Sequence, residues 1–334
     1  MSAPRAVIVG VEGTALTPGE RDFLRDADPW GFILFARNVM DPGQLRRLTA
    51  GLRDAVGRDA PVLIDQEGGR VQRLRAPHWR EYLPALEQME RASDPIRAQW
   101  LRNRLIAAEL HEAGIDVNCA PLADLVEEDT HPVLRNRLYG SDVDTVVRAA
   151  RAAADALMAG GVLPVVKHVP GYGRASVDSH LSLPRVAAPL DELRLRDFAP
   201  FRALADLPMA MTAHIVMEAI DPGNPATTSP LVMDEIRYGI GYDGLVMSDD
   251  LSMNALSGTP GARAAAVIAA GCDLVLHCNG RLAEMEDVAA AVPRLQGAAL
   301  ERSERAMAAR SAPTPCDFNA LERELDDLLE GVSA

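Results

Sequence analysis

Eight short apolar runs recur along the chain, and longer segments with helical spacing separate them. Each run is almost uniformly apolar, as strands are when both faces of a parallel sheet are covered. This alternation is typical of α/β proteins. The expected strands are Ala6–Val11, Gly31–Phe35, Val62–Asp65, Asp116–Cys119, Leu163–His168, Ala210–Ile215, Leu245–Ser248 and Asp273–Leu276.

The intervening segments carry residues that begin and end helices. Asp41-Pro42 and Asp94-Pro95 each combine a capping side chain with proline at the first helical position, and Gly114 is a natural helix end. The expected helices are Pro42–Val56, Pro95–Ala113, Asp142–Ala159, Leu190–Leu204, Pro230–Arg237 and Ala262–Ala270, with two C-terminal helices at Leu300–Arg310 and Asn319–Leu329.

Reactive side chains stand at the carboxyl ends of five different strands. A closed barrel gathers these ends around one mouth, whereas an open doubly wound sheet would scatter them. The first strand is also not followed by G-x-G-x-x-G, although Gly10-Val-Glu-Gly13 comes near it. We therefore predict an α/β fold, a single-domain (β/α)8 TIM barrel over residues 1–334 with extra C-terminal helices. The strand-end residues are Asp65, Asn118, Lys167, His168, His214 and Asp249.

The net charge bears on which partners can bind, and the cysteine spacing bears on the cellular compartment. The formal net charge is −14, so nucleic acid and anionic membrane surfaces are unlikely to bind. The four cysteines show neither zinc-site nor disulfide spacing, and Ala6 to Val11 is too short for a signal sequence. We expect a cytoplasmic protein with reduced thiols, and a monomer because no apolar helix face is left over.

The segment Asp65-Gln-Glu-Gly-Gly-Arg-Val-Gln-Arg73 follows the third expected strand. The Asp65 carboxylate can accept two sugar hydroxyls, and the glycine pair allows a sharp turn. Arg70 and Arg73 supply fixed donors. In the simpler alternative, this is a surface turn whose arginines pair with Glu67 or Asp65.

A second segment, Lys167-His-Val-Pro-Gly-Tyr-Gly173, ends the fifth strand, and Asp178-Ser-His180 follows it. A buried lysine beside a histidine implies a polar pocket. The glycine-rich stretch beyond reads as a mobile loop that could deliver a histidine, with Asp178 able to orient the ring and raise its pKa. A solvated loop and a salt-bridged pair in the barrel interior are the simpler alternatives.

The third segment, Gly244-Leu-Val-Met-Ser-Asp-Asp-Leu-Ser-Met253, passes through the seventh strand into a polar turn. A carboxylate that attacks an anomeric carbon must sit at a fixed strand end facing a pocket. Side chains alternate along a strand, so only one of Asp249 and Asp250 can point inward, and alternation does not choose between them. In the simpler interpretation, Asp250 caps the next turn.

No cofactor or metal is expected. The first strand does not end in His-x-His, which disfavours a metal-dependent amidohydrolase, and Gly-x-Ser-x-Gly is absent, which disfavours a serine hydrolase. Phosphate-cradling glycine loops and metal-spaced ligands are also missing from the sequence.

Together the three segments resemble glycoside hydrolase family 3, and within it the β-N-acetylglucosaminidases of bacterial cell-wall recycling. The resemblance spans roughly Gly31 to Asn279. It implies a retaining mechanism in which Asp249 is the nucleophile and His180, supported by Asp178, is the general acid and then the general base. The terminal sugar would be held by Asp65, Arg73, Arg137, Lys167 and His168.

Two positions depart from the family pattern. The family usually has Gly-x-Arg-Ser-Phe/Tyr, where this chain has Arg135-Asn-Arg137-Leu-Tyr139, which predicts a different local backbone around Arg137. Tyr172 replaces a histidine that is common between two glycines, which should alter loop contacts but not chemistry.

Two other functions remain open from the sequence: a glycoside phosphorylase on the same scaffold, and a non-catalytic sugar-binding regulator. The expected partner is a small carbohydrate that contains N-acetylglucosamine. Anhydromuramic acid, a muropeptide and a chitin fragment are all possible on its reducing side.

Overall fold

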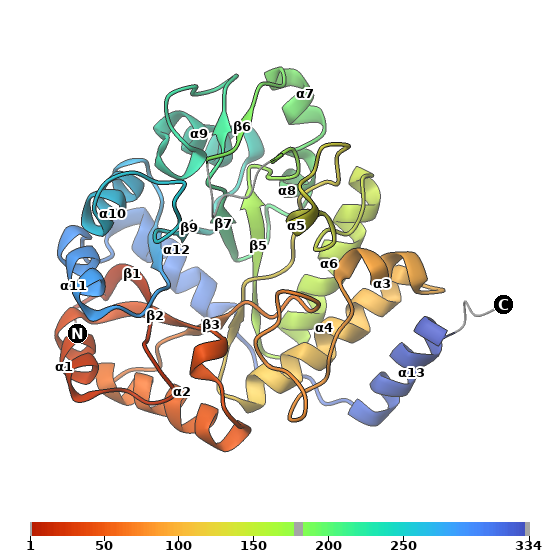
Figure 1. Cartoon of the computed structure of the whole chain (residues 1–334), viewed down its shortest axis with the longest axis horizontal. Helices are drawn as coiled ribbons and strands as arrows, with labels where there is room; N and C mark the ends of the chain where they lie inside the picture. Colours follow the sequence, from red (N-terminus) through yellow and green to blue (C-terminus); the bar gives the residue numbers. More distant parts are fainter. Residues whose placement is uncertain (1, 177–182, 331–334) are drawn as a thin grey trace.

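The computed structural model describes residues 2–176 and 183–330, in which eight parallel strands close into a barrel. Neighbouring strands follow the order β1, β10, β9, β7, β5, β4, β3, β2 around the ring. Helices surround the strands (Figure 1), which confirms the predicted TIM barrel. The barrel strands are β1 (Arg5–Gly10), β2 (Pro29–Leu34), β3 (Val62–Ile64), β4 (Val117–Asn118), β5 (Leu163–Val169), β7 (Met209–Thr212), β9 (Leu245–Asp250) and β10 (Leu274–His277).

The helices begin where the capping residues predict. Asp41 accepts a hydrogen bond from Gln44 N and Asp94 from Arg97 N, and proline follows each cap. The α-helices are α1 (Pro18–Ala27), α2 (Pro42–Val56), α3 (Ala85–Arg91), α4 (Pro95–Glu112), α5 (Pro132–Arg135), α6 (Val143–Ala159), α7 (Leu190–Leu195), α8 (Ala199–Ala203), α9 (Pro230–Asp234), α10 (Pro260–Ala269), α11 (Leu282–Ala291), α12 (Gly297–Ala308) and α13 (Phe318–Glu330).

Some elements differ from the sequence prediction. The single helix expected at Leu190–Leu204 is two helices, α7 and α8, because Pro200 has no N–H to continue the ladder back to Arg196. The π-helical turn Glu235–Ile240 extends α9 until Gly241 ends it at φ 84°. A separate two-stranded parallel sheet, β6 (Arg185–Val186) with β8 (Val216–Met217), was not predicted.

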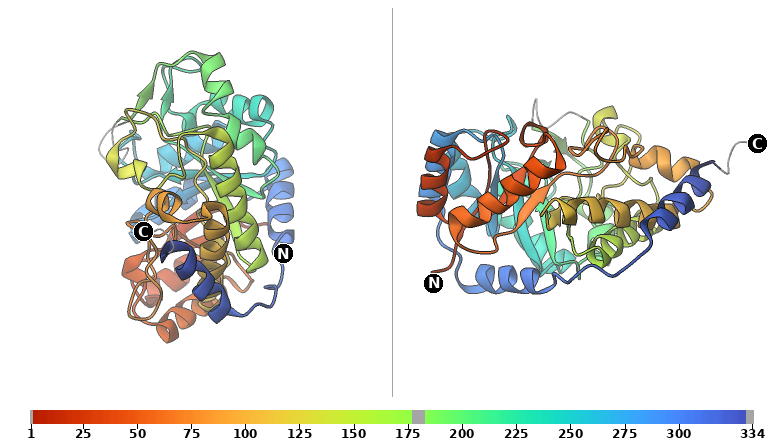
Figure 2. Two further views of the ribbon diagram at one scale, coloured as in Figure 1. Left: turned by 90° about the vertical axis from the view of Figure 1, so that its right-hand side faces the viewer. Right: turned by 90° about the horizontal axis from the view of Figure 1, so that it is seen from below.

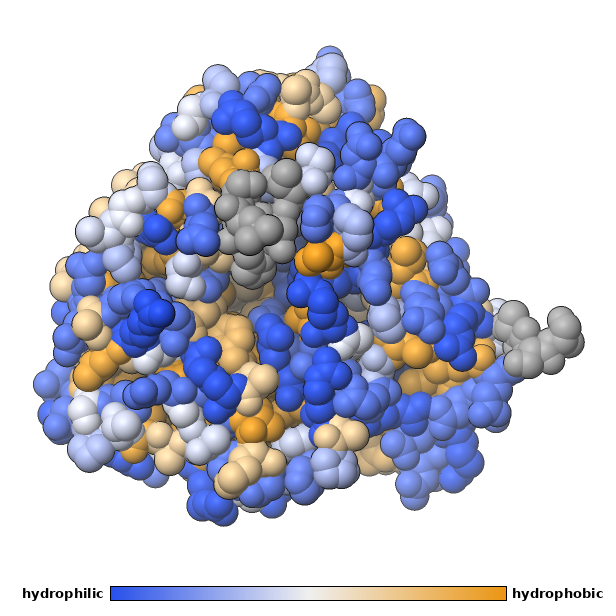
Figure 3. Space-filling model, viewed as in Figure 1, coloured by the Kyte–Doolittle hydropathy of each residue, from blue (hydrophilic) through white to orange (hydrophobic). Residues whose placement is uncertain are grey.

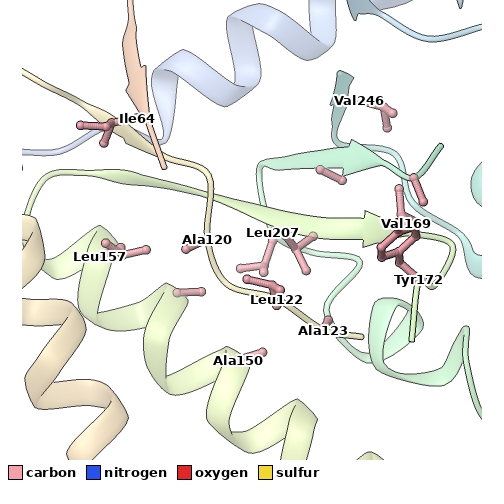
Figure 4. Close-up of a cluster of buried hydrophobic side chains, with 14 of the residues drawn as sticks. Ile64, Ala120, Leu122, Ala123, Ala150, Leu157, Val169, Tyr172, Leu207 and Val246 are labelled. Atoms are coloured by element: carbon pink, nitrogen blue, oxygen red, sulfur yellow. The ribbon is translucent and has the colours of Figure 1, made fainter. Parts of the chain in front are cut away.

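The core has two layers. One lies between the barrel and its helices; Figure 4 shows part of it, with Ala150 and Leu157 of α6 facing Ala120 and Leu122 beside β5. The other fills the barrel interior and includes Trp30, whose indole N–H donates to Ser303 Oγ on α12 at 2.6 Å. Helix α12 therefore covers the end of the barrel where the strands begin (Figure 2).

The C-terminal helix α13 packs along α4 at the side of the barrel (Figures 1 and 2). The Arg97 guanidinium donates to both carboxylate oxygens of Glu324, at 2.7 and 2.8 Å, and Arg80 pairs with Asp326. No helix within residues 2–176 and 183–330 combines the length and apolarity that a membrane span requires.

Candidate functional site

A pocket of about 270 Å³ opens at the carboxyl ends of the strands. The surrounding face is mainly hydrophilic, with hydrophobic side chains in small groups (Figure 3). Polar and charged groups dominate one part of the lining and apolar side chains the rest. The lining residues are Phe35, Asp65, Arg70, Val71, Arg73, His131, Val133, Leu134, Arg137, Lys167, His168, Tyr172, Met211, Asp249, Asp250, Met253, Leu276 and Cys278.

A continuous chain of alternating charges runs through this pocket wall. Arg73 Nη2 lies 3.2 Å from Asp65 Oδ2, and Asp65 Oδ1 lies 3.0 Å from Lys167 Nζ. Lys167 Nζ also contacts Glu67 Oε1 at 2.6 Å. Glu67 in turn accepts from Arg137 Nε at 2.9 Å and Arg137 Nη2 at 2.8 Å. Three cations and two carboxylates are thus fixed before any ligand binds.

The charges in this chain stabilise one another against burial. Burial alone would raise the pKa of Asp65 and of Glu67, but Lys167 and the two arginines hold both values below their usual range. Burial alone would lower the pKa of Lys167, but the two carboxylates raise it above its usual value. Asp65, Glu67 and Lys167 are therefore charged at neutral pH.

The Arg137 segment reaches the pocket despite its unusual sequence. Leu138 is fully buried, and Arg135 is exposed and donates to Glu127 O at 3.1 Å. Neither residue displaces the Arg137 side chain from the pocket lining.

The adjacent carboxylates Asp249 and Asp250 at the end of β9 differ in their bonding. Asp250 accepts from Ser252 N at 3.0 Å and from Cys278 N at 3.1 Å, so it caps the turn and ties it to β10. Asp249 accepts from Asp250 N at 2.8 Å. Both line the pocket, contrary to the expectation that alternation turns only one of them inward, but the bonding of Asp250 is that of a structural group.

His168 is oriented by a carboxylate that the sequence analysis did not single out. Asp124, almost fully buried, lies 2.8 Å from His168 Nδ1 and also accepts from Tyr172 N at 2.7 Å. A carboxylate at that distance accepts a hydrogen bond from Nδ1–H, so in the neutral ring Nε2 is the acceptor. Tyr172 also packs beside this ring, with the centroids 5.4 Å apart.

Two of the strand-end residues have structural roles and do not line the pocket. Asn118 is fully buried and exchanges two hydrogen bonds of 3.0 Å with the backbone of Gln66. His214 bonds to Thr227 Oγ1 at 2.8 Å and to Asp250 O at 3.0 Å. Asp178 and His180 lie outside the described residues.

Glu67 and Asp124 are the two site residues that sequence reasoning missed. The sequence could have indicated Glu67 as a site residue, because it stands between Asp65 and the glycine pair in a segment already identified. Asp124 had no such indication, since it lies 44 residues before His168 and six residues beyond the end of β4.

Within residues 2–176 and 183–330, no group of three or more histidine, cysteine, aspartate or glutamate side chains could hold a metal ion. The functional groups that the pocket presents are carboxylates, an imidazole and fixed cations.

A closed (β/α)8 barrel with a charged pocket at the carboxyl ends of its strands is the architecture of a barrel enzyme. The sequence profile of the glycosyl hydrolase family 3 N terminal domain matches residues 12–308, and the chain belongs to this family. The predicted resemblance is thereby confirmed.

Related proteins specify the activity more closely. The chain is 40% identical to a β-hexosaminidase of Alkalilimnicola ehrlichii over 281 residues, covering 82% of this chain and 80% of that protein. It is 38% identical to a β-hexosaminidase of Pseudomonas aeruginosa, covering 87% of each. The crystal structure of NagZ from Neisseria gonorrhoeae in complex with N-trifluoroacetyl-D-glucosamine superposes with a TM-score of 0.87 at 30% identity, covering 98% of this chain and 99% of that one. The activity is therefore that of a β-hexosaminidase, a glycoside hydrolase.

Proposed function

We propose that this chain is a retaining exo-β-N-acetylglucosaminidase that removes terminal, non-reducing β-linked N-acetylglucosamine. The observation that carries the proposal is the pocket itself. Asp249, at a fixed strand end, lines it together with Arg73, Asp65, Lys167 and Arg137. Glu67 is not part of the lining but pairs with Lys167 and Arg137. Hydrolysis of such a sugar requires a carboxylate that attacks the anomeric carbon. Its binding requires fixed hydrogen-bond donors and acceptors for the hydroxyl and amide groups.

In the proposed mechanism, Asp249 attacks the anomeric carbon and forms a covalent glycosyl-enzyme. The His180 imidazolium, supported by Asp178, gives its proton to the departing oxygen as the glycosidic bond breaks. Neutral His180 then takes a proton from water, which attacks the same carbon and releases Asp249. Two inversions leave the product with the configuration of the substrate.

Substrate binding is assigned to five side chains. Asp65 would accept hydrogen bonds from hydroxyl groups, and Arg73, Arg137 and Lys167 would donate to oxygens of the sugar and its N-acetyl group. His168 would present its Nε2 acceptor because Asp124 holds the proton on Nδ1. The charge pairs already present mean that little rearrangement is needed when the sugar binds.

The natural substrate we propose is a muropeptide fragment in cell-wall recycling. The four cysteines, all unpaired and three of them buried, suit a reducing compartment such as the cytoplasm. Turnover of a disaccharide of N-acetylglucosamine and anhydromuramic acid, compared with chitobiose, tests the assignment. Preference for chitobiose would favour a chitin fragment instead.

The first experiment compares hydrolysis of 4-nitrophenyl β-N-acetylglucosaminide and of the β-glucoside by wild-type protein and by Asp249→Asn. We expect strong preference for the N-acetyl substrate and a kcat loss of roughly 10³-fold or more in the variant, the scale seen when a catalytic group is removed. Asp287→Asn is the control, because that carboxylate accepts from Gly261 N at 2.7 Å outside the pocket. Wild-type turnover by Asp249→Asn would exclude the nucleophile assignment.

The same assay with added inorganic phosphate separates hydrolysis from phosphorolysis. We expect free N-acetylglucosamine as the product with and without phosphate, and NMR should show the β-anomer first. A sugar phosphate as the main product would identify a phosphorylase.

A further inference from the structure

Glu67 is a buried carboxylate between two cations of the pocket, and no role in the reaction has yet been given to it. Its side chain is 5% exposed and bridges Lys167 and Arg137. We propose that Glu67 is a positioning residue that holds Lys167 and Arg137 in the conformations that bind the sugar. This inference rests on the proposed function, in which those two cations contact the substrate.

The backbone around Glu67 fixes the direction of its carboxylate. Glu67 N donates to Val71 O at 2.9 Å, and the buried Arg102 guanidinium donates to Glu67 O. Gly68 follows at φ +100°, where an added Cβ would lie 2.0 Å from Arg102 Nη2. The turn that carries Glu67 therefore depends on glycine, and it leaves the carboxylate facing the pocket wall.

Arg137 depends on Glu67 for its orientation. Among the described residues, both hydrogen bonds recorded for its guanidinium go to the two Glu67 oxygens, in a bidentate arrangement. Arg137 also follows the four-residue helix α5, which offers little support of its own. Without Glu67, this long side chain would have to be ordered by the substrate, and that cost would appear as weaker binding.

Lys167 depends on Glu67 less strongly, because it also contacts Asp65 at 3.0 Å. Removing the Glu67 charge leaves Lys167 paired with Asp65 alone. The Lys167 ammonium group would then interact more strongly with Asp65, the carboxylate that the proposed mechanism uses to accept hydrogen bonds from sugar hydroxyls. Loss of Glu67 thus affects both ends of the charge chain.

A purely structural ion pair would behave differently, and the chain contains a matched example. Glu235 accepts from Arg194 Nε at 2.9 Å and Arg194 Nη2 at 2.7 Å, in the same bidentate geometry and outside the pocket. Its side chain is 9% exposed. Glu235→Gln therefore removes a pair of the same bidentate geometry outside the site, in which the arginine is 43% exposed against 17% for Arg137.

The experiment measures kcat, KM and stability to denaturant for wild type, Glu67→Gln, Glu67→Asp and Glu235→Gln on 4-nitrophenyl β-N-acetylglucosaminide. We expect Glu67→Gln to raise KM at least tenfold and to change kcat by a smaller factor, since the two cations bind ground and transition states alike. Glu67→Asp keeps the charge but cannot reach both partners, so its KM should rise by a smaller factor. Glu235→Gln should lose stability with KM unchanged.

A double variant measures the coupling between Glu67 and Arg137. Because Glu67 is proposed to act mainly through Arg137, while Lys167 is also held by Asp65, the KM of Glu67→Gln/Arg137→Gln should lie within about threefold of that of Arg137→Gln alone. KM values of both Glu67 variants within twofold of wild type, or fully multiplicative effects in the double variant, would overturn the proposal. Should Glu67→Gln not fold, Glu67→Asp alone decides. An inactive wild type would instead refute the proposed function.

Discussion

Residues that are far apart in the sequence determine what the pocket side chains can do. His168 offers an acceptor at Nε2 only because Asp124 bonds to Nδ1, and the two residues are 44 positions apart. Asp124 also accepts from the backbone N–H groups of His168 and Tyr172. One buried carboxylate therefore sets both the ring tautomer and the path of the chain that leaves β5.

Asp124→Asn tests this dependence. The amide can keep the bond to Tyr172 N, but its NH2 group would then face His168 Nδ1 and force the other tautomer, which turns Nε2 into a donor. We expect a loss of about 1–3 kcal/mol in the free energy of unfolding, because charge-assisted hydrogen bonds to a buried carboxylate become weaker, neutral ones. We also expect KM to rise about tenfold. Denaturant titration and steady-state kinetics measure the two effects, and an unchanged KM would show that the tautomer does not matter.

At the scale of elements, helix α4 carries a half-buried acid near its C-terminal end. Glu109 accepts a hydrogen bond from Arg80 N at 3.0 Å, and the Arg80 side chain pairs with Asp326 of α13. Burial raises the pKa of Glu109 from 4.5 to about 7, despite the opposing hydrogen bond that Arg80 N donates to it. The native state thus holds a proton between pH 4.5 and 7 that the unfolded chain has released.

The sign of the pH dependence follows from this raised pKa. The Glu109 contribution to stability falls as pH rises from about 4.5 to about 7, by a total on the order of 3 kcal/mol. Glu109→Gln keeps an oxygen for Arg80 N and removes the titration. We expect the variant to match wild type at pH 5 and to be more stable at pH 8, measured by urea unfolding. A variant that is less stable than wild type at pH 8 would contradict the burial argument.

For the whole molecule, the pocket has fixed cations on its own side chains, because Arg73, Arg137 and Lys167 all line it. The described residues contain no cluster of metal ligands. We expect turnover of the aryl β-N-acetylglucosaminide to be unchanged within error after incubation with EDTA and dialysis. A loss of activity that Zn²⁺ or Mg²⁺ restores would contradict this expectation.

Much of the architecture could be predicted because its signals are local. Strand runs such as that of β5 and caps such as Asp41 and Asp94 are determined by residues within a few positions of one another, and α2 has the predicted bounds. The break between α7 and α8 was missed although Pro200 marks it, since the apolar spacing continues across it.

The sequence by itself determined the barrel, the strand ends that meet at its mouth and the pocket residues Asp65, Lys167, His168 and Asp249. These follow from short-range periodicity and from the rule that parallel strands present their carboxyl ends together. Only the tertiary structure decided that Glu67 bridges Lys167 and Arg137 and that Asp250 is bound into a turn. Barrel closure brings together Asp65 and Lys167, 102 positions apart, and Glu67 and Arg137, 70 apart. No local pattern specifies such pairs, because their geometry depends on the ring closing.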